Sequence, residues 1–421
     1  MNHLKGQVCI KNTLFEYDFL ASWIKYTRLK YRYTQAYLAH GICSTSHLSY
    51  FESGKKKLHA DLIEALLDKL SLTEIKAIEP IGNIRQKFYT LLYEMECLNK
   101  EAAADIYSEL QALEPLLSQS PYEMEYRVYC FAYECFSGQK NYAELEDELY
   151  LLDKIYESLP NDLKSLYLFA SGKIFFKYKG HQEGIQRLLA ASELKASPWL
   201  DYHIGFSYCF DSNPLKGVYF LEQALHQYER NGRYINVLWC HNYLGICFSF
   251  LKNYDQAQVH FNTALTGAQY FNIGSILGDL YINLSDIYLK FKDYTQSIAY
   301  AKKSLEYVKD PLLAVSNLIE AYAALDSKAD IQKLLDTYLT PDYEDSRYYP
   351  WVYFLKLYYF HFDEAIFYEE TTESILPFYE LINYIEFIRS IQIKLIEYLE
   401  SHRRYKDANL YYKKILKKAI Y

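Results

Sequence analysis

The chain has 421 residues, of which 51% are hydrophobic, and a net charge of −8; this is enough apolar sequence to form a sizeable core, and it excludes a disordered protein. It has only 15 glycines and 10 prolines, about half of their usual share, which disfavours a β-rich chain with many tight turns. We therefore expect an all-α fold of long helices in series. The 47 tyrosines suit a thin structure with much half-buried surface, because the ring is buried while the hydroxyl stays in water.

The cysteines and the N-terminus indicate a cytoplasmic protein. The eight cysteines form no CxxC pair, and no secretion signal stands at the start of the chain, so we expect reduced thiols. The longest apolar stretch, Tyr348–Phe362, is interrupted by Pro350, Lys356 and His361 and is too short to cross a bilayer. We therefore expect no membrane as a partner.

Charge is divided unevenly along the sequence. Residues 1–80 carry a net charge of +3 and the remainder carries −11. Within residues 20–60, seven basic residues stand against one acidic residue, Glu52. A small basic head on an acidic body favours nucleic-acid binding by the head, although a solvated helix face would explain the same charge.

Apolar residues from Phe19 to Leu72 are spaced for about four or five short helices. Thr34 is expected to cap a helix at 35–40, and Ser44 a helix that ends near Gly54. Two short helices joined by a tight turn form a helix-turn-helix, whose second helix enters the major groove of double-stranded DNA.

The residues of this region form an extended motif, Arg28-x6-Gln35-x2-Leu38-Ala39-x-Gly41-Ile42-Cys43-Ser44-x-Ser46-x-Leu48-Ser49-x2-Glu52-Ser53-Gly54-Lys55. The motif resembles the helix-turn-helix of the lambda-repressor and Cro type. Its short turn is similar to that of the peptide-pheromone regulators of Gram-positive bacteria (the Rap, Rgg, NprR, PlcR and PrgX group). NprR-like members of this group match the chain best in length and layout.

The resemblance implies a set of DNA-contacting residues, namely Gln35, Ser44, Thr45, Ser46, His47, Tyr50, Lys55 and Lys56. Gln35 would clamp a phosphate, the residues from Ser44 to Tyr50 would face the groove, and the two lysines would lie along the DNA backbone. Arg28 and Glu52 match a pair that forms a structural ion pair between the first and third helices of such heads.

Two residues depart from the motif of the group. Arg32 stands in the turn where glycine is usual, and Tyr50 stands where arginine or lysine is frequent. The expected recognition helix also has no arginine or asparagine that could read a base with two hydrogen bonds. These departures leave two alternatives: a modest sequence preference, or a head that has lost DNA binding.

The body contains an internal repeat with a step of 40 residues, at which Gly205, Gly245 and Ser285 correspond. The middle copy reads Leu244-Gly245-x2-Phe248, followed by Ala257-x3-Phe261-x2-Ala264. This copy is similar to the tetratricopeptide pattern of paired helices. We therefore expect a helix-turn-helix domain at 1–78 and a right-handed tetratricopeptide-repeat solenoid at 79–421, with about eight repeats and a degenerate helical pair at 84–118.

In the tetratricopeptide pattern, the first helix of each pair lines the concave wall. The expected wall residues are His203, Phe206, Asn242, Ile246, Ser249, Phe250, Asn283, Ile287, Lys290, Asn317 and Tyr322. The resemblance implies that asparagine amides on this wall hold the backbone of a short signalling peptide, because an amide both donates and accepts. Alternatively, Asn242 and Asn283 only satisfy neighbouring helices.

No motif for catalysis, a metal or a cofactor is found: HExxH, GxxxxGK[ST], GxSxG and GxGxxG are all absent, and the histidines are dispersed. We therefore expect a cytoplasmic quorum-sensing transcription regulator that is not an enzyme. It would act as a homodimer or higher homo-oligomer that binds DNA under the control of a peptide. The alternative is a scaffold or phosphorelay modulator that binds a partner protein, such as a response regulator, and whose helix-turn-helix is vestigial or dimerising.

Overall fold

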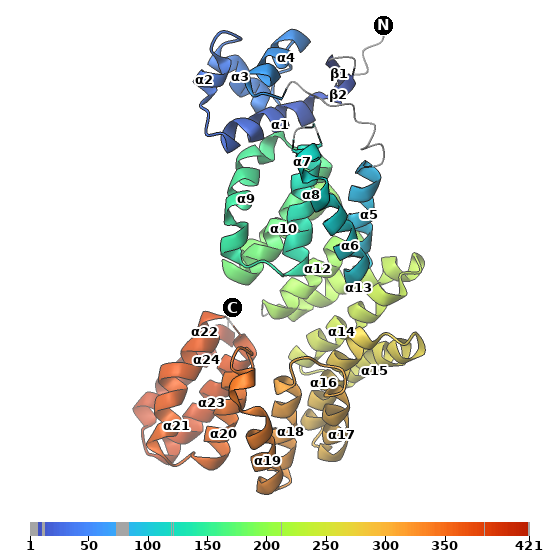
Figure 1. The fold of residues 1–421 in the computed structure, drawn as a ribbon. Coiled ribbons are helices and arrows are strands. Elements are labelled where there is room, and N and C mark those ends of the chain that lie inside the picture. The colour runs from blue at the N-terminus through green and yellow to red at the C-terminus, as the bar shows by residue number, and fades with distance from the viewer. Residues whose placement is uncertain are drawn as a thin grey trace. The chain divides into compact units, whose positions relative to one another are not determined.

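The computed structural model describes residues 7–10, 13–72, 84–118, 120, 122–211, 213–382 and 384–419. It divides into two compact units, Met1–Cys240 and His241–Tyr421, and each is described by itself. Almost every described element is a helix (Figure 1), which confirms the predicted all-α class.

A small β-hairpin precedes the first helix and was not predicted. Its strands are β1 (Gln7–Ile10) and β2 (Thr13–Glu16), which pair antiparallel with Gln7 opposite Glu16. The two strands read Gln-Val-Cys-Ile and Thr-Leu-Phe-Glu, so neither has the alternation of polar and apolar residues that predicts a strand.

The head consists of α1 (Tyr17–Lys30), α2 (Gln35–Ala39), α3 (Thr45–Glu52) and α4 (Ala60–Lys69). Both predicted caps are confirmed. The side-chain oxygen of Thr34 accepts a hydrogen bond from the Tyr37 amide at 3.1 Å, and that of Ser44 accepts one from the His47 amide at 3.2 Å. Gly54 follows α3 with φ +69°, a left-handed conformation that a residue with a Cβ rarely adopts.

The rest of the first unit is a succession of antiparallel helices. They are α5 (Ile84–Glu96), α6 (Lys100–Ala112), α7 (Glu114–Leu117), α8 (Glu123–Ser137), α9 (Tyr142–Ile155) with the 3₁₀ turn η2 (Tyr156–Ser158), α10 (Asn161–Tyr178), α11 (His181–Leu194), α12 (Pro198–Phe210) and α13 (Pro214–Arg230). The predicted boundary between head and body, at residue 78, lies outside the described residues and remains a prediction.

The chain passes into the second unit within α14 (Tyr234–Phe250) and continues as helix pairs. These are α15 (Tyr254–Tyr270), α16 (Gly274–Lys290), α17 (Tyr294–Ser304), α18 (Leu312–Ala324), α19 (Lys328–Tyr338), α20 (Tyr349–Phe360), α21 (Ala365–Glu370), the π-helical turn η4 (Thr371–Ile375), α22 (Leu376–Leu381), α23 (Ile385–Ser401) and α24 (Tyr405–Ala419). A 3₁₀ turn, η3 (Pro341–Tyr343), lies between α19 and α20.

The small residues of the repeat lie where paired helices touch, as predicted. A Cβ added at Gly245 would come within 2.5 Å of the Phe261 ring, so only glycine allows α14 and α15 to approach this closely. At the corresponding place in the next pair, the hydroxyls of Ser285 and Ser297 are 3.1 Å apart and buried. This hydrogen bond satisfies two polar groups that burial would otherwise destabilise.

Arg32 occupies a strained position in the turn between α1 and α2. Its φ is +57°, and its side chain is exposed. The left-handed region costs an L-residue with a Cβ about 1–2 kcal/mol, which explains why glycine is usual at this position in related heads.

We expect Arg32→Gly to stabilise the head by about 0.5–1 kcal/mol, because the strain is removed and no buried contact is lost. The measurement is the thermal unfolding midpoint of the full chain. Arg389→Gly is the matched control, since Arg389 is an exposed arginine inside α23 and glycine in a helix destabilises by about 1 kcal/mol. A lower midpoint for both variants would contradict the explanation.

Candidate DNA-binding head and candidate peptide wall

The second helix of the helix-turn-helix presents its polar residues to solvent. Five of the predicted DNA-contacting residues, Ser44, Thr45, Ser46, His47 and Tyr50, are exposed on or beside α3. Leu48 and Phe51 of the same helix are buried in the head. The helix is therefore amphipathic, with its polar face exposed and its apolar face in the core of the head.

The ion pair between Arg28 and Glu52 is confirmed. Arg28 donates two hydrogen bonds to the Glu52 carboxylate, at 2.6 and 2.7 Å, and both side chains are buried. The Gln35 amide also donates to this carboxylate, at 2.7 Å. Three helices of the head therefore meet at one carboxylate. The predicted role of Gln35 as a phosphate clamp requires its amide to leave Glu52 or to be shared with a phosphate.

Basic residues continue directly from the C-terminus of α3. Lys55 and Lys56 are exposed, as is Lys57, and the Lys56 ammonium lies 3.5 Å from His47 Nε2. This contact places Lys56, which is predicted to contact the DNA backbone, beside His47, which is predicted to face the bases. Cations at this position would lie near phosphates if α3 entered a groove.

Exposed tyrosines beside α2 were not singled out from the sequence. Tyr31 and Tyr37 are about half exposed, and each packs against the ring of Tyr33, with centroid distances of 5.8 and 4.6 Å. In the sequence, these tyrosines are indicated only by the run Tyr31-Arg32-Tyr33. Such a run does not show whether the rings pack against one another or are separately exposed.

Asparagine amides connect the first helices of three successive pairs in the second unit. Asn283 of α16 donates to the side-chain oxygen of Asn242 on α14, at 2.9 Å. Asn317 of α18 donates to the backbone carbonyl of Ile282 on α16, at 3.2 Å. Asn242, Asn283 and Asn317 therefore lie on neighbouring helices, and their amides form hydrogen bonds between those helices. Their role in holding a peptide remains a prediction.

The other predicted wall residues of the second unit differ in exposure. Ile246, Ser249, Phe250 and Tyr322 are half-buried. Lys290 is exposed and forms an ion pair with Asp286 at 3.2 Å, and the pKa of Lys290 is raised, chiefly by this carboxylate. Ile287 is buried, as are Asn242 and Asn317, and its place on a peptide-binding wall remains a prediction.

Two predicted wall residues belong to the first unit, on α12. Phe206 is half-buried, whereas His203 is buried and its Nε2 has no hydrogen-bond partner among the described residues. Burial lowers the pKa of His203 well below its usual value, and Lys173 lowers it further. His203 is therefore neutral and packs between the rings of Phe169 and Trp199.

Two histidines that are far apart in the sequence form a pair. His241 Nδ1 and His260 Nδ1 are 2.9 Å apart, so one ring donates to the other. Burial and the neighbouring His241 lower the pKa of His260 to about 4. The two histidines are 19 residues apart in the sequence, so the spacing of neighbours on one helix could not predict their contact. Within the described ranges, no group of three or more metal-ligating side chains is found.

Two further expectations concern cysteines and membranes. Seven of the eight cysteines are free thiols, namely Cys43, Cys97, Cys130, Cys135, Cys209, Cys240 and Cys247. Across the part of the chain that the structure describes, no helix is both long and apolar enough to span a bilayer.

Comparison with protein families gives one match, in the body. The family described as tetratricopeptide repeat matches residues 197–269, which correspond to α12 through α15. The match confirms the predicted repeat type, and it includes the block around Gly245 on which the prediction was based.

Comparison with individual proteins extends over most of the chain. The transcriptional activator NprA of Geobacillus stearothermophilus is 22% identical over 404 residues, which cover 89% of this chain and 97% of NprA.

Two solved structures of the quorum sensor NprR have a similar fold. The apo form from B. thuringiensis gives a TM-score of 0.62 at 20% identity and covers 80% of this chain and 98% of its own. The complex with the cognate peptide NprX gives a TM-score of 0.60 at 18% identity, with 81% and 99% covered.

A Rap protein complexed with competence and sporulation factor gives a TM-score of 0.67 at 15% identity and covers 80% of this chain and 97% of its own. At these identities the structures establish the fold, which is the one that the sequence motifs implied. The chain is therefore similar in sequence to NprA and in fold to NprR and a Rap protein, with a helix-turn-helix head and a tetratricopeptide body.

Proposed function

We propose that this protein is a cytoplasmic transcription regulator whose head binds double-stranded DNA and whose body binds a short signalling peptide. The observation that supports DNA binding best is the exposed polar face of α3, held in place by the buried contacts among Arg28, Gln35 and Glu52. A regulator of this kind needs no catalytic group, and NprA is named as a transcriptional activator.

The peptide would bind to the wall formed by α14, α16 and α18 in the second unit. The amides of Asn242, Asn283 and Asn317 lie on these three helices, and an extended peptide backbone offers groups that can replace their present partners. The solved NprR complex contains a cognate peptide, which supports the same role here.

Peptide binding would act on DNA binding through a shift between conformations of a homodimer or higher homo-oligomer. Such coupling typically amounts to about 1–3 kcal/mol, which corresponds to a change in DNA affinity of about 5- to 150-fold.

The second candidate function is that of a scaffold or phosphorelay modulator whose body binds a partner protein such as a response regulator. The similarity in fold to a Rap protein, with a TM-score of 0.67, keeps this candidate open. Binding of DNA by the purified full chain separates the two, because the scaffold requires none.

Changing Lys55, Lys56 and Lys57 to alanine should weaken binding to every DNA sequence, since each lost phosphate contact reduces counterion release. The slope of log K against log salt should flatten by about 0.9 for each contact. The measurement is fluorescence anisotropy with a labelled duplex at several salt concentrations. The control is the same change at Lys406, Lys413 and Lys414 of α24, which are equally exposed. An unchanged slope would remove Lys55–Lys57 from the interface.

Sequence preference should depend on the outer face of α3. Replacing Thr45 or Tyr50 by alanine should change the preferred half-site in a selection from random duplexes, while binding to non-specific DNA stays nearly constant, because base contacts and not phosphate contacts are altered. An equal loss of affinity for all sequences would show that these residues do not read bases.

Asn242→Ala and Asn283→Ala should each weaken peptide binding by about 1–3 kcal/mol, because a buried peptide group is left without a partner. This corresponds to about 5- to 150-fold in Kd, measured by calorimetry with the cognate peptide. Asn262→Ala is the control, since Asn262 is exposed on α15, the second helix of its pair. If both wall variants bind normally, the peptide lies elsewhere.

A further inference from the structure

Helix α1 of the head is buried on nearly all sides. Trp23 and Tyr26, like Leu20 and Ile24, have side chains with almost no exposed surface. An amphipathic surface helix buries one stripe, whereas a helix that is apolar all round lies between two layers. In this chain one layer is α3 of the head and the other is formed by α8, α9 and η2 of the body. Figure 1 shows α8 and α9 beneath α1.

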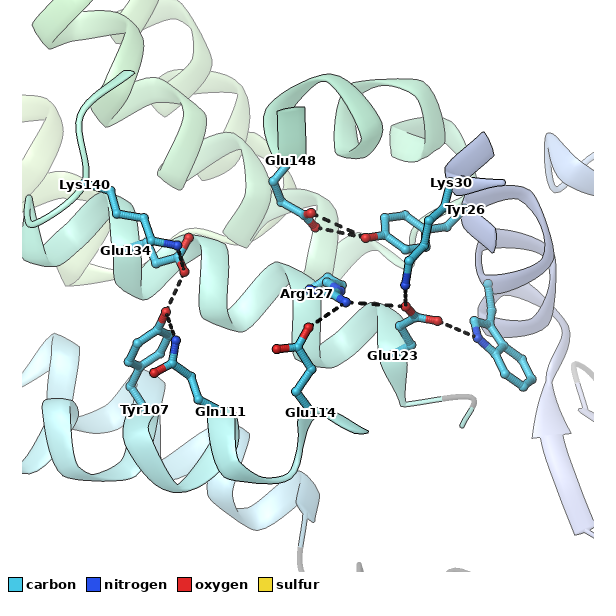
Figure 2. A network of polar contacts seen from close by, with 11 residues as sticks. Tyr26, Lys30, Tyr107, Gln111, Glu114, Glu123, Arg127, Glu134, Lys140 and Glu148 are labelled. Atoms are coloured by element: carbon cyan, nitrogen blue, oxygen red, sulfur yellow. Dashed lines mark hydrogen bonds and ion pairs between the residues drawn. The ribbon is translucent and has the colours of Figure 1, made fainter. Parts of the chain in front are cut away.

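The buried carboxylate of Glu123 joins α1 to the body. Glu123, at the first position of α8, is 1% exposed. It accepts a hydrogen bond from the Trp23 indole at 3.0 Å and another from the Lys30 ammonium at 3.3 Å. Figure 2 shows it between Lys30 and Arg127, whose guanidinium is 3.8 Å away. Burial raises the pKa of Glu123, and Lys30, Arg127 and the Trp23 indole oppose this shift. The partners that α1 brings therefore offset the cost of burying this carboxylate against the head.

A second contact lies further along the same helix. The Tyr26 hydroxyl donates to the Glu148 carboxylate of α9 over 3.4 to 3.5 Å, as Figure 2 shows. Burial raises the pKa of Glu148 to about 7, and Arg127 opposes this shift. Arg127 also forms an ion pair with Glu114 at 2.9 Å, so the cation beside Glu123 has a second partner within the body.

The body also contacts the recognition helix itself. The Ser158 hydroxyl of η2 donates to the backbone carbonyl of Glu52, the last residue of α3. The last carbonyls of a helix have no partner within it, so Ser158 supplies a cap from outside the head. The lysines at 55–57 follow this end after Ser53 and Gly54.

The docked arrangement leaves the DNA-facing side open. Ser46, His47 and Tyr50 are exposed, while Ser158 contacts the Glu52 carbonyl and Glu123 contacts Trp23 and Lys30 of α1. The contact with the body is therefore compatible with DNA binding and holds α3 in one orientation.

We propose that α8, α9 and η2 form a positioning surface for the recognition helix, with Glu123 and Ser158 as its positioning residues, so that the body sets DNA affinity without touching DNA. This inference rests on the proposed DNA-binding function. The helix-turn-helix then works as one rigid part with the start of the body and not as an independent domain.

The test compares Glu123→Gln and Ser158→Ala in the full chain, because both residues lie on the body and away from the DNA-facing side. The control is Ser165→Ala: Ser165 is also buried, and its hydroxyl donates to the Ala191 carbonyl between α10 and α11 at 2.9 Å. Hydrogen exchange of α1 and α3 reports docking, and anisotropy with a labelled mixed-sequence duplex at several salt concentrations reports DNA binding.

We expect faster exchange in α1 for Glu123→Gln and at the end of α3 for Ser158→Ala. Both variants should bind the duplex about 3- to 10-fold more weakly, the size expected for one lost hydrogen bond. The slope of log K against log salt should stay as in the wild type, because no phosphate contact is removed. If Glu123→Gln does not fold, Ser158→Ala decides alone.

Several results would overturn the inference. One is faster exchange with unchanged or tighter DNA binding, and another is an equal loss of binding in Ser165→Ala. Unchanged exchange in both variants would show that these contacts do not hold the head. If the wild-type chain binds no duplex, the proposed DNA-binding function is wrong, and the body cannot set DNA affinity. Hydrogen exchange would still establish whether the head is docked on the body.

Discussion

The head depends on the carboxylate of Glu52. It accepts hydrogen bonds from Arg28 of α1 and Gln35 of α2, while its own backbone ends α3. Because the group is buried, each donor must be present for the charge to be tolerated. The relative orientation of the three helices is thus determined by a polar contact, and the apolar core of the head is packed around it. The body reaches the same residue through Ser158.

The parts of the fold that could be predicted from sequence are those with local signals. Thr34 and Ser44 cap the helices that follow them, and both signals lie within a few residues. The pair of Arg28 and Glu52 is separated by 24 residues and was found only because the head motif has a fixed spacing. The small residues of the body could be predicted for the same reason, since the repeat places them at a constant step.

The contacts that could not be predicted are those between residues whose separation in the sequence is not fixed by a motif. Glu123 and Trp23 are 100 positions apart, and neither belongs to a motif. Tyr26 and Glu148 are likewise distant, and an aromatic residue on a helix most often indicates packing within its own domain. The site residues remain predictions for a related reason: exposure shows that a side chain is available, but it does not show which partner contacts it.

The buried hydroxyl pair of Ser285 and Ser297 has a consequence for how the repeat can vary. In the preceding pair the corresponding positions are Gly245 and Ala257, neither of which carries a polar group. A change of one serine alone would leave the other hydroxyl buried without a partner, whereas the simultaneous loss of both would not. These two positions should therefore be substituted together during divergence, as a coupled pair between α16 and α17.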